Sequence, residues 1–97
     1  MKLRFTPRAL QNLATIAKYL TEQNPQAAAR VSSAILRSIE NLVLFPQAGR
    51  LQKAEGVRKL VTRHYRYLIY YTADRAADEI AILAIRHPAQ DREHSDS

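Results

Sequence analysis

The chain has 97 residues, 46% of them hydrophobic and none of them cysteine, and 15 Lys and Arg against 9 Asp and Glu give a formal net charge of +6. This length supports one small domain with one core and excludes a multidomain enzyme. The absence of cysteine excludes disulfides and thiolate metal sites, and no stretch has the apolar length of a signal peptide or a membrane span. We therefore expect a protein of the reducing cytoplasm that does not associate with membranes.

The acidic residues are unevenly distributed along the chain. Asp91, Glu93 and Asp96 make the last ten residues net negative, so residues 1–87 are more basic than the whole. A basic body attracts polyanions or an acidic protein partner. Because the chain after His87 is polar and has no aliphatic residue larger than alanine, we predict a single domain at residues 1–87 and a flexible polar tail at residues 88–97.

The N-terminal segment predicts a short strand followed by a helix. Apolar and basic residues alternate over residues 2–5, which is typical of a strand. Thr6 and Pro7 then form a hydroxyl N-cap followed by proline at the first helical position, so a helix begins at Pro7 and continues to about Gln23. Its predicted core-facing stripe consists of Leu10, Leu13, Ile16, Ala17 and Leu20.

A second helix follows almost at once. Asn24 and Pro25 repeat the cap-and-proline signal, and the helix ends where Phe45 is followed by Pro46. So short a connection predicts an antiparallel helix hairpin whose apolar stripes need a sheet to cover them. The stripe of the second helix consists of Ala28, Val31, Ile35, Ile39 and Leu42.

The second half of the chain predicts a loop and three strands. Residues 47–56 contain both glycines of the chain and form the loop. Residues rich in β-branched and aromatic side chains predict strands at Val57–Thr62, Tyr65–Thr72 and Glu79–Arg86, with a polar turn at Ala73–Asp78. The predicted fold class is α+β: an N-terminal strand and a helix hairpin packed on a mainly antiparallel, four-stranded sheet that ends in a meander.

Four motifs occur in a fixed order within these elements. The order of elements and motifs resembles the RelE/ParE superfamily of small toxins from type II toxin-antitoxin modules, and the motifs are similar to those of the ParE-like branch. The resemblance extends over nearly the whole chain up to Asp91. The motifs are Leu42-x-x-Phe45-Pro46-x-x-Gly49-Arg50, Gly56-Val57-Arg58, Tyr67-Leu68-Ile69-Tyr70-Tyr71 and Ile80-x-Ile82-Leu83-x-Ile85-Arg86-His87-x-x-Gln90-Asp91.

The resemblance implies a toxin that a cognate antitoxin silences by laying a segment across its helices and sheet, within a toxin-antitoxin hetero-oligomer. A ParE-like toxin poisons DNA gyrase through contacts and without catalysis, whereas the RelE branch cuts messenger RNA in the ribosome. A third hypothesis is a toxin relic that retains only its affinity for the antitoxin.

The candidate catalytic residues indicate whether the chain resembles the mRNA-cleaving RelE branch or the ParE-like branch. Cleavage of RNA requires activation of a 2′-hydroxyl, stabilisation of charge at phosphorus and protonation of the leaving oxygen. Arg58 and Arg66 could hold a phosphate, and the imidazole of His87 is the third candidate group. Many RelE-branch nucleases, however, carry two basic residues on one strand face, whereas Arg58 and Lys59 are adjacent and must point to opposite faces.

The aromatic pattern leads to the same preference. RelE-branch nucleases tend to have a C-terminal aromatic residue that stacks on a base, and here no aromatic residue follows Tyr71. We therefore favour a gyrase toxin without catalytic residues. No cofactor or metal is expected, because the three histidines have no ligand-like spacing and the chain has no glycine-rich phosphate loop.

The cationic and aromatic residues of the second half form the predicted binding surface for target or antitoxin. Arg50 has a structural alternative, which is to cap the carboxyl end of the second helix. The stem of Arg58 should be partly buried beside Leu60, leaving a guanidinium that needs an anion. The predicted contact residues are Arg50, Arg58, Arg63, Arg66, Tyr67, Arg86 and His87.

The tyrosines divide between the two faces of the third predicted strand. Side chains alternate along a strand, so Tyr65, Tyr67 and Tyr71 should share one face and Tyr70 should lie on the other. Tyrosine buries a large ring and keeps a hydroxyl for water or a partner. These residues therefore favour a binding role without identifying the ligand.

Overall fold

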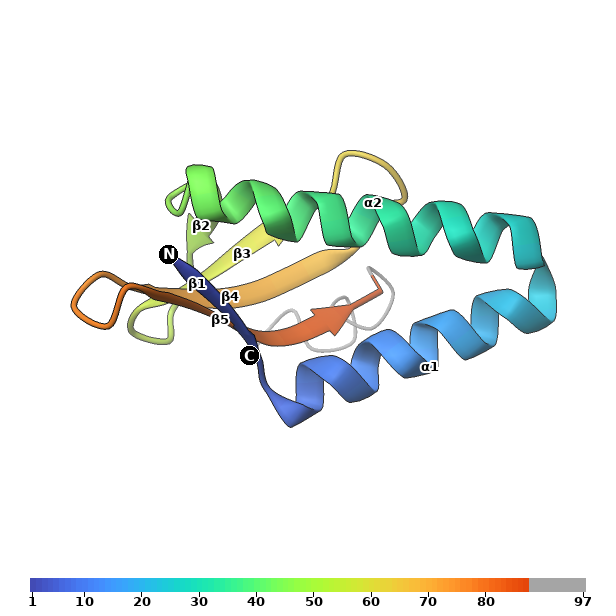
Figure 1. Cartoon of the computed structure of the whole chain (residues 1–97), viewed down its shortest axis with the longest axis horizontal. Helices are drawn as coiled ribbons and strands as arrows, with labels where there is room; N and C mark the ends of the chain where they lie inside the picture. The colour runs from blue at the N-terminus through green and yellow to red at the C-terminus, as the bar shows by residue number, and fades with distance from the viewer. Residues whose placement is uncertain (88–97) are drawn as a thin grey trace.

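The structure of the chain is a computed structural model that describes residues 1–87, so the predicted tail at 88–97 lies outside the described residues. Two helices pack on one five-stranded sheet, which confirms the α+β fold class. Figure 1 shows the helices running antiparallel, with their connection projecting beyond the sheet. The elements are β1 (Lys2–Phe5), α1 (Pro7–Gln23), α2 (Pro25–Leu44), β2 (Arg50–Leu51), β3 (Val57–Val61), β4 (Leu68–Asp74) and β5 (Glu79–Arg86).

Local capping sets the bounds of both helices. The side chain of Thr6 accepts a hydrogen bond of 3.1 Å from the backbone N–H of Ala9, and Pro7 occupies the first turn of α1. Asn24 ends α1 and begins α2, because its side chain accepts bonds from the N–H groups of Gln26 and Ala27. These caps satisfy N–H groups that have no partner within the helix. Both predicted helices are confirmed.

The helix stripes form half of the core, with one correction. All five predicted positions of α2 are buried. On α1, Leu13, Ile16 and Leu20 pack against the core, but Leu10 is 55% exposed and Ala9 is fully buried in its place. The methyl side chain of Ala9 is short enough for α1 to approach β5 closely, whereas the side chain of Leu10, the next residue in the same turn, points outward.

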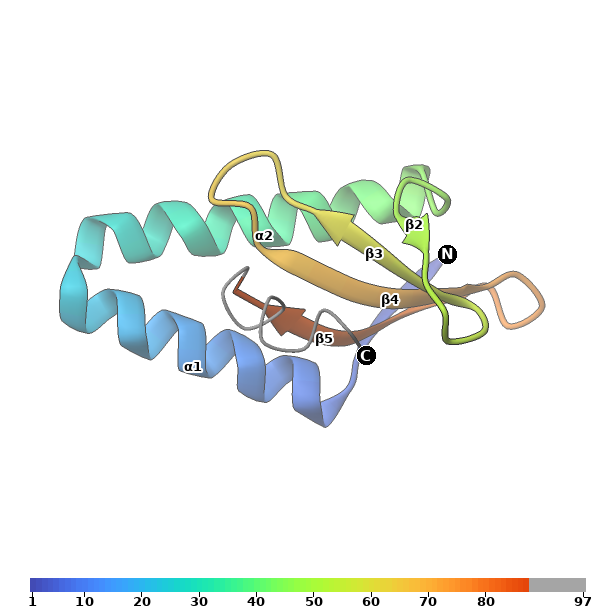
Figure 2. The ribbon, with the colours of Figure 1, turned by 180° about the vertical axis from the view of Figure 1, so that it is seen from behind.

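The sheet has the order β1-β5-β4-β3-β2. β1 pairs in parallel with β5, and the other neighbours pair antiparallel, so the predicted meander of β3, β4 and β5 is confirmed. The sheet has one strand more than the predicted four, because Arg50 and Leu51 pair with Lys59 and Arg58 inside the segment predicted to be a loop. Figure 2 shows α1 beside β5, a strand with which it is in contact.

A bulge in β5 joins the sheet to α1. Tyr70 pairs with Ala84 and Tyr71 with Ile82, so Leu83 is the extra residue. β1 ends at Phe5, and beyond it the side chains of Thr6 and Asn12 take over the outer edge of β5. The hydroxyl of Thr6 donates to the carbonyl of Leu83 at 2.9 Å, and Oδ1 of Asn12 accepts from the N–H of Ile85 at 2.9 Å.

The third predicted strand begins later than expected. It was predicted at Tyr65–Thr72, but β4 begins at Leu68, because residues 63–66 form the turn between β3 and β4. Tyr65 therefore lies outside the strand and is 47% exposed, while Tyr67 and Tyr71 point into the core as the alternation predicted. The high β propensity of Tyr65 is overridden by the turn that residues 63–66 form.

Candidate functional site

The loop after α2 is held to the sheet by two side chains from β3 and β4. The buried hydroxyl of Tyr71 donates to the carbonyl of Pro46 at 2.8 Å and accepts from the N–H of Gly49 at 2.8 Å. Nη1 of Arg58 donates to the carbonyl of Gly49 at 2.8 Å. We call Pro46–Gly49 with Arg58 and Tyr71 the loop clamp. It gives the Phe45-Pro46-x-x-Gly49 motif a structural role.

Gly49 is required by this close approach. A Cβ added to Gly49 would lie 2.8 Å from both Cε1 and Oη of Tyr71 and 3.0 Å from the backbone of Lys59. The backbone can pass between the tyrosine and the strand only because this position has no side chain.

The placement of Arg58 corrects the expectation that its guanidinium needs an anion. Its Nη1 donates to the neutral carbonyl groups of Gln47 and Gly49 in the loop that follows α2. Arg58 thus binds carbonyls just beyond the end of α2, a role similar to the capping predicted as an alternative for Arg50. Arg50 itself is exposed on β2. Arg58 pairs with Tyr71 and Lys59 with Tyr70, so the two adjacent cations lie on opposite faces of the sheet, as predicted.

Burial and the clamp shift the ionisation of Tyr71. Burial raises the pKa of Tyr71 above 10.0, and the hydrogen bond from Gly49 and the charge of Arg58 offset part of that increase. The phenol therefore keeps its proton, which is the one it donates to Pro46.

A strained turn joins β3 to β4. Tyr65 has φ 69° and Arg66 has φ 53°, so two successive residues with side chains occupy the left-handed region. Each such residue costs about 1–3 kcal/mol unless its surroundings compensate, and such strain is concentrated at functional sites. Here the hydroxyl of Thr62 donates to the carbonyl of His64 at 2.7 Å and accepts from the N–H of Tyr67 at 2.9 Å.

The rings of Tyr67 and His87 are in contact beside this turn. Tyr67 is 5% exposed, and the ring of His87 lies edge-on to it with centroids 5.5 Å apart. Burial, and to a smaller extent the phenol of Tyr19 on α1, raises the pKa of Tyr67 above 10.0. Tyr19 is 61% exposed and was not among the predicted contact residues.

The predicted contact residues thus divide into two groups. Arg50 and Arg58 lie near β2 and the loop clamp. The other five lie where the turn at residues 63–66 meets the end of β5, because Arg86 pairs with Leu68 and His87 contacts Tyr67. This second group, which we call the turn-end cluster, consists of Arg63, Arg66, Tyr67, Arg86 and His87.

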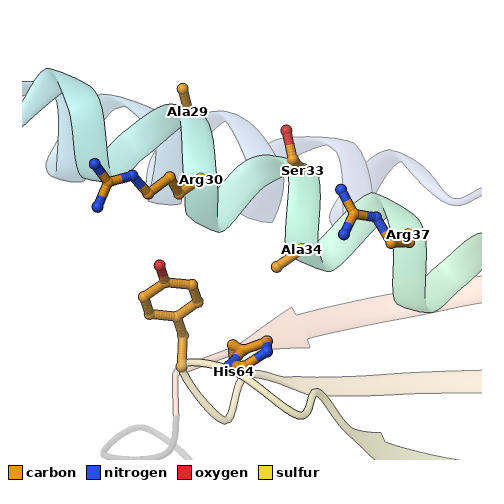
Figure 3. Close-up of a pocket in the computed structure, with 7 residues that line it drawn as sticks. Ala29, Arg30, Ser33, Ala34, Arg37 and His64 are labelled. Atoms are coloured by element: carbon orange, nitrogen blue, oxygen red, sulfur yellow. The ribbon is translucent and has the colours of Figure 1, made fainter.

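Two adjoining cavities between α2 and the turn contain residues that the sequence analysis missed. One has a volume of about 500 Å³ and the other about 490 Å³, and Ala34, Arg37 and His64 line both. Figure 3 shows Arg30 and Arg37 on α2 across the first cavity from His64. We call the two cavities together the α2 groove. Seven-residue spacing places Arg30 and Arg37 on one helix face, but only the tertiary structure brings that face to the turn.

No metal centre is formed within residues 1–87, since no three His, Asp or Glu side chains there lie close enough to share an ion. In the same part of the chain, neither helix combines the length and apolar character needed to cross a membrane.

Comparison with known proteins gives matches along nearly the whole chain. Residues 3–92 match the family described as ParE toxin of type II toxin-antitoxin system, parDE. Y4kP of Sinorhizobium fredii, a protein that carries the name of a toxin, is 34% identical over 89 residues, covering 92% of this chain and 90% of that protein. Toxin RelE2 of Caulobacter vibrioides is 34% identical over 86 residues, covering 89% and 93%.

Solved structures agree with these matches. The structure described as the chromosomal ParDE TA system from P. aeruginosa superposes with a TM-score of 0.78 at 26% identity, covering 90% of this chain and 95% of that one. The E. coli RelBE toxin-antitoxin complex shares the fold, with a TM-score of 0.63 at 16% identity and coverage of 89% and 94%. Because the family match spans both helices and every strand from Leu3 onward, the chain belongs to the ParE toxin family of type II toxin-antitoxin systems.

Proposed function

We infer that this chain is a toxin that binds and poisons DNA gyrase without cleaving nucleic acid, and that a cognate antitoxin neutralises it. The placement of Arg58 supports this hypothesis most directly. Its guanidinium donates to the carbonyl of Gly49 at 2.8 Å on the helix side of the sheet, while Lys59 lies on the other face. A nuclease that needs two cations beside one phosphate could not use Arg58 and Lys59 together, because they lie on opposite faces of the sheet.

The second candidate is a ribosome-dependent mRNA endonuclease. It is favoured by one observation, the presence of Arg66 and His87 at the same end of the sheet, where an arginine and an imidazole could act on one phosphodiester. Both residues are exposed, so neither is held in a protected cavity that would exclude water.

Purified toxin tests the two candidates in parallel. Supercoiling by gyrase should be inhibited and gyrase-DNA cleavage complexes should accumulate, while message bound to ribosomes stays intact. Cleaved message together with normal supercoiling would establish the nuclease instead. Harmless expression in cells, with both assays negative, would indicate a toxin relic that retains only antitoxin binding.

Two substitutions separate contact from catalysis. For a gyrase poison, His87→Ala and Arg66→Ala should change the inhibitory concentration by less than about tenfold, because each removes one contact. For a nuclease, either substitution should lower the cleavage rate by about a hundredfold or more, since a proton-transfer group or a charge-stabilising group is lost.

The antitoxin partner is supported by the solved ParDE and RelBE relatives, which are toxin-antitoxin structures. The basic body of this chain is suited to an acidic partner. Association measured at increasing salt should become slower and weaker, because screening reduces the attraction between opposite charges. Salt-independent association would contradict the acidic character of the partner.

A further inference from the structure

The first cavity of the α2 groove is lined by cations and hydrogen-bond donors from two separate elements, whereas the lining of the second includes the apolar side chains of Leu42, Phe45 and Leu60. Arg30, Ser33 and Arg37 come from α2, and His64 and Tyr65 come from the strained turn. Arg63 adds a third guanidinium in the second cavity. Within residues 1–87, no Asp or Glu lines either cavity. Such a surface concentrates positive potential and is suited to an anion with several charges.

The two arginines of α2 are placed to contact different charges. Seven residues of helix correspond to about 10.5 Å along the axis, so Arg30 and Arg37 lie roughly two turns apart on one face. Because that distance is longer than one phosphate group, the two guanidinium groups can bind different phosphates of an extended polyanion. The residues between them on the groove are small, Ser33 and Ala34, so a backbone can approach the helix.

An exposed aromatic ring completes this side of the groove. Tyr65 is 47% exposed, and its backbone at φ 69° is held by the bonds of Thr62 within the turn. The strained backbone presents His64 and Tyr65 side by side, with ring centroids 6.3 Å apart. Rings beside a cationic groove form stacking platforms for the bases of single strands.

We propose that the first cavity of the α2 groove binds the sugar-phosphate backbone of a single nucleic-acid strand, with Arg30 and Arg37 on its phosphates and Tyr65 stacked on a base. An acidic peptide fits the first cavity less well, because amphipathic peptides need apolar pockets and its apolar lining consists of alanines and the tyrosine ring. The proposal goes beyond the proposed function, because such a groove would serve a toxin that acts on gyrase-bound DNA or on message.

The test measures binding of the purified full chain to a fluorescently labelled twelve-nucleotide thymidine strand by anisotropy at several salt concentrations. The double variant Arg30→Ala with Arg37→Ala should weaken binding at least about tenfold. The slope of log affinity against log salt should become shallower by about 1.4, the value for two lost phosphate contacts to a single strand.

A matched control removes the same charge elsewhere. Arg8 and Lys18 are exposed on α1 and do not line the groove. The double variant Arg8→Ala with Lys18→Ala should change affinity by no more than about twofold. If both double variants weaken binding equally, only the general positive field attracts the strand and the proposal is wrong. Unchanged thermal melting of both variants confirms that they are folded.

Tyr65→Leu tests the stacking contact separately. It should weaken binding of the thymidine strand about fivefold or more, and it should leave binding of an abasic strand of equal length unchanged. Equal effects on both strands would exclude stacking by Tyr65.

An acidic peptide provides the opposing outcome. Labelled twelve-residue polyglutamate should bind more weakly than the thymidine strand, and Tyr65→Leu should not affect it. If polyglutamate binds as tightly and loses as much affinity in the Arg30 and Arg37 variant, the groove is a site for an acidic protein segment and the proposal fails. No gyrase or ribosome is present in these measurements, so their outcome is independent of the supercoiling and cleavage assays.

Discussion

Near the start of β3, Arg58 and its β4 neighbour Tyr71 bind four backbone groups of the loop after α2. At the other end of β3, the turn at residues 63–66 presents exposed cations on a strained backbone. The two regions use the same residue types, arginine and tyrosine. In the loop clamp their polar groups are occupied within the protein and stabilise its fold. In the α2 groove Arg30, Arg37 and Tyr65 are exposed, and so are Arg63 and Arg66 of the turn-end cluster, whereas Tyr67 of that cluster is buried.

This comparison shows that a residue shared with a toxin family need not be a contact residue. Tyr71 and Arg58 both lie in motifs that resemble the family, and both are explained by the loop that they hold. If a substitution at either position abolishes toxicity, the first explanation to test is reduced stability of the fold and not the loss of a contact with the target. Measurements of stability distinguish a position that holds the fold from one that contacts the target.

The largest expected effect is at Tyr71. Tyr71→Ala should lower the free energy of unfolding by about 3–5 kcal/mol, because it empties a fully buried site. Tyr71→Phe keeps the ring and should cost about 1–3 kcal/mol, since it leaves Gly49 and Pro46 without their partner. Denaturant unfolding followed by circular dichroism measures both. A cost below about 0.5 kcal/mol for Tyr71→Phe would show that the clamp does not stabilise the fold.

Arg58 should have a smaller effect of the same kind. Arg58→Ala should cost about 1–2 kcal/mol in unfolding free energy, because the buried Gly49 loses the donor to its carbonyl. The matched control is Arg63→Ala, an exposed arginine of the turn, which should change stability by no more than about 0.5 kcal/mol. Equal costs would remove the distinction between the two ends of β3.

At the strained turn we expect a substitution that stabilises the protein. Arg66→Gly should raise the free energy of unfolding by about 1 kcal/mol, because glycine adopts φ 53° without the steric cost of a side chain. Arg63→Gly removes the same charge at a residue with negative φ and should destabilise the protein. Thermal melting of the two variants gives the comparison. A lower melting temperature for Arg66→Gly would show that the turn is not strained.

The smallest effect is the dependence of stability on alkaline pH. The pKa values of Tyr67 and Tyr71 are raised above 10.0 by burial, so the unfolded chain releases these protons first. Their contribution is therefore fully present below pH 10 and is lost as pH rises through the folded pKa values. Absorbance titration should show that Tyr67 and Tyr71 release their protons at higher pH in the folded protein than in the chain unfolded by denaturant. Replacing both by Phe should reduce that difference between the two titrations.

Sequence reasoning predicted most of the fold because its strongest signals are local. A hydroxyl or amide cap followed by proline places the first turns of α1 and α2 without any tertiary contact, and the apolar run of β5 was placed with its observed bounds. β2 was missed because two residues form a strand only through their pairing with Lys59 and Arg58. The start of β4 was placed too early because residue preferences do not reveal a left-handed turn at Tyr65 and Arg66.

The site was predicted less completely for the same reason. The alternation of side chains along a strand correctly predicted that Arg58 and Lys59 point to opposite faces of the sheet, because this alternation depends only on backbone geometry. The partner of Arg58 is a carbonyl nine residues away across a loop, and Arg30 and Arg37 become candidates only because α2 lies beside the turn. Neither relation is visible in residue spacing.

The sequence by itself determined the two capped helices, the meander, the basic character of residues 1–87 and the opposite directions of two neighbouring cations. Each of these follows from composition, capping or a backbone period, which act over a few residues. The tertiary structure decided which arginines are occupied within the fold and which face a groove. That division depends on contacts between residues far apart in the chain, where packing brings donors and acceptors together.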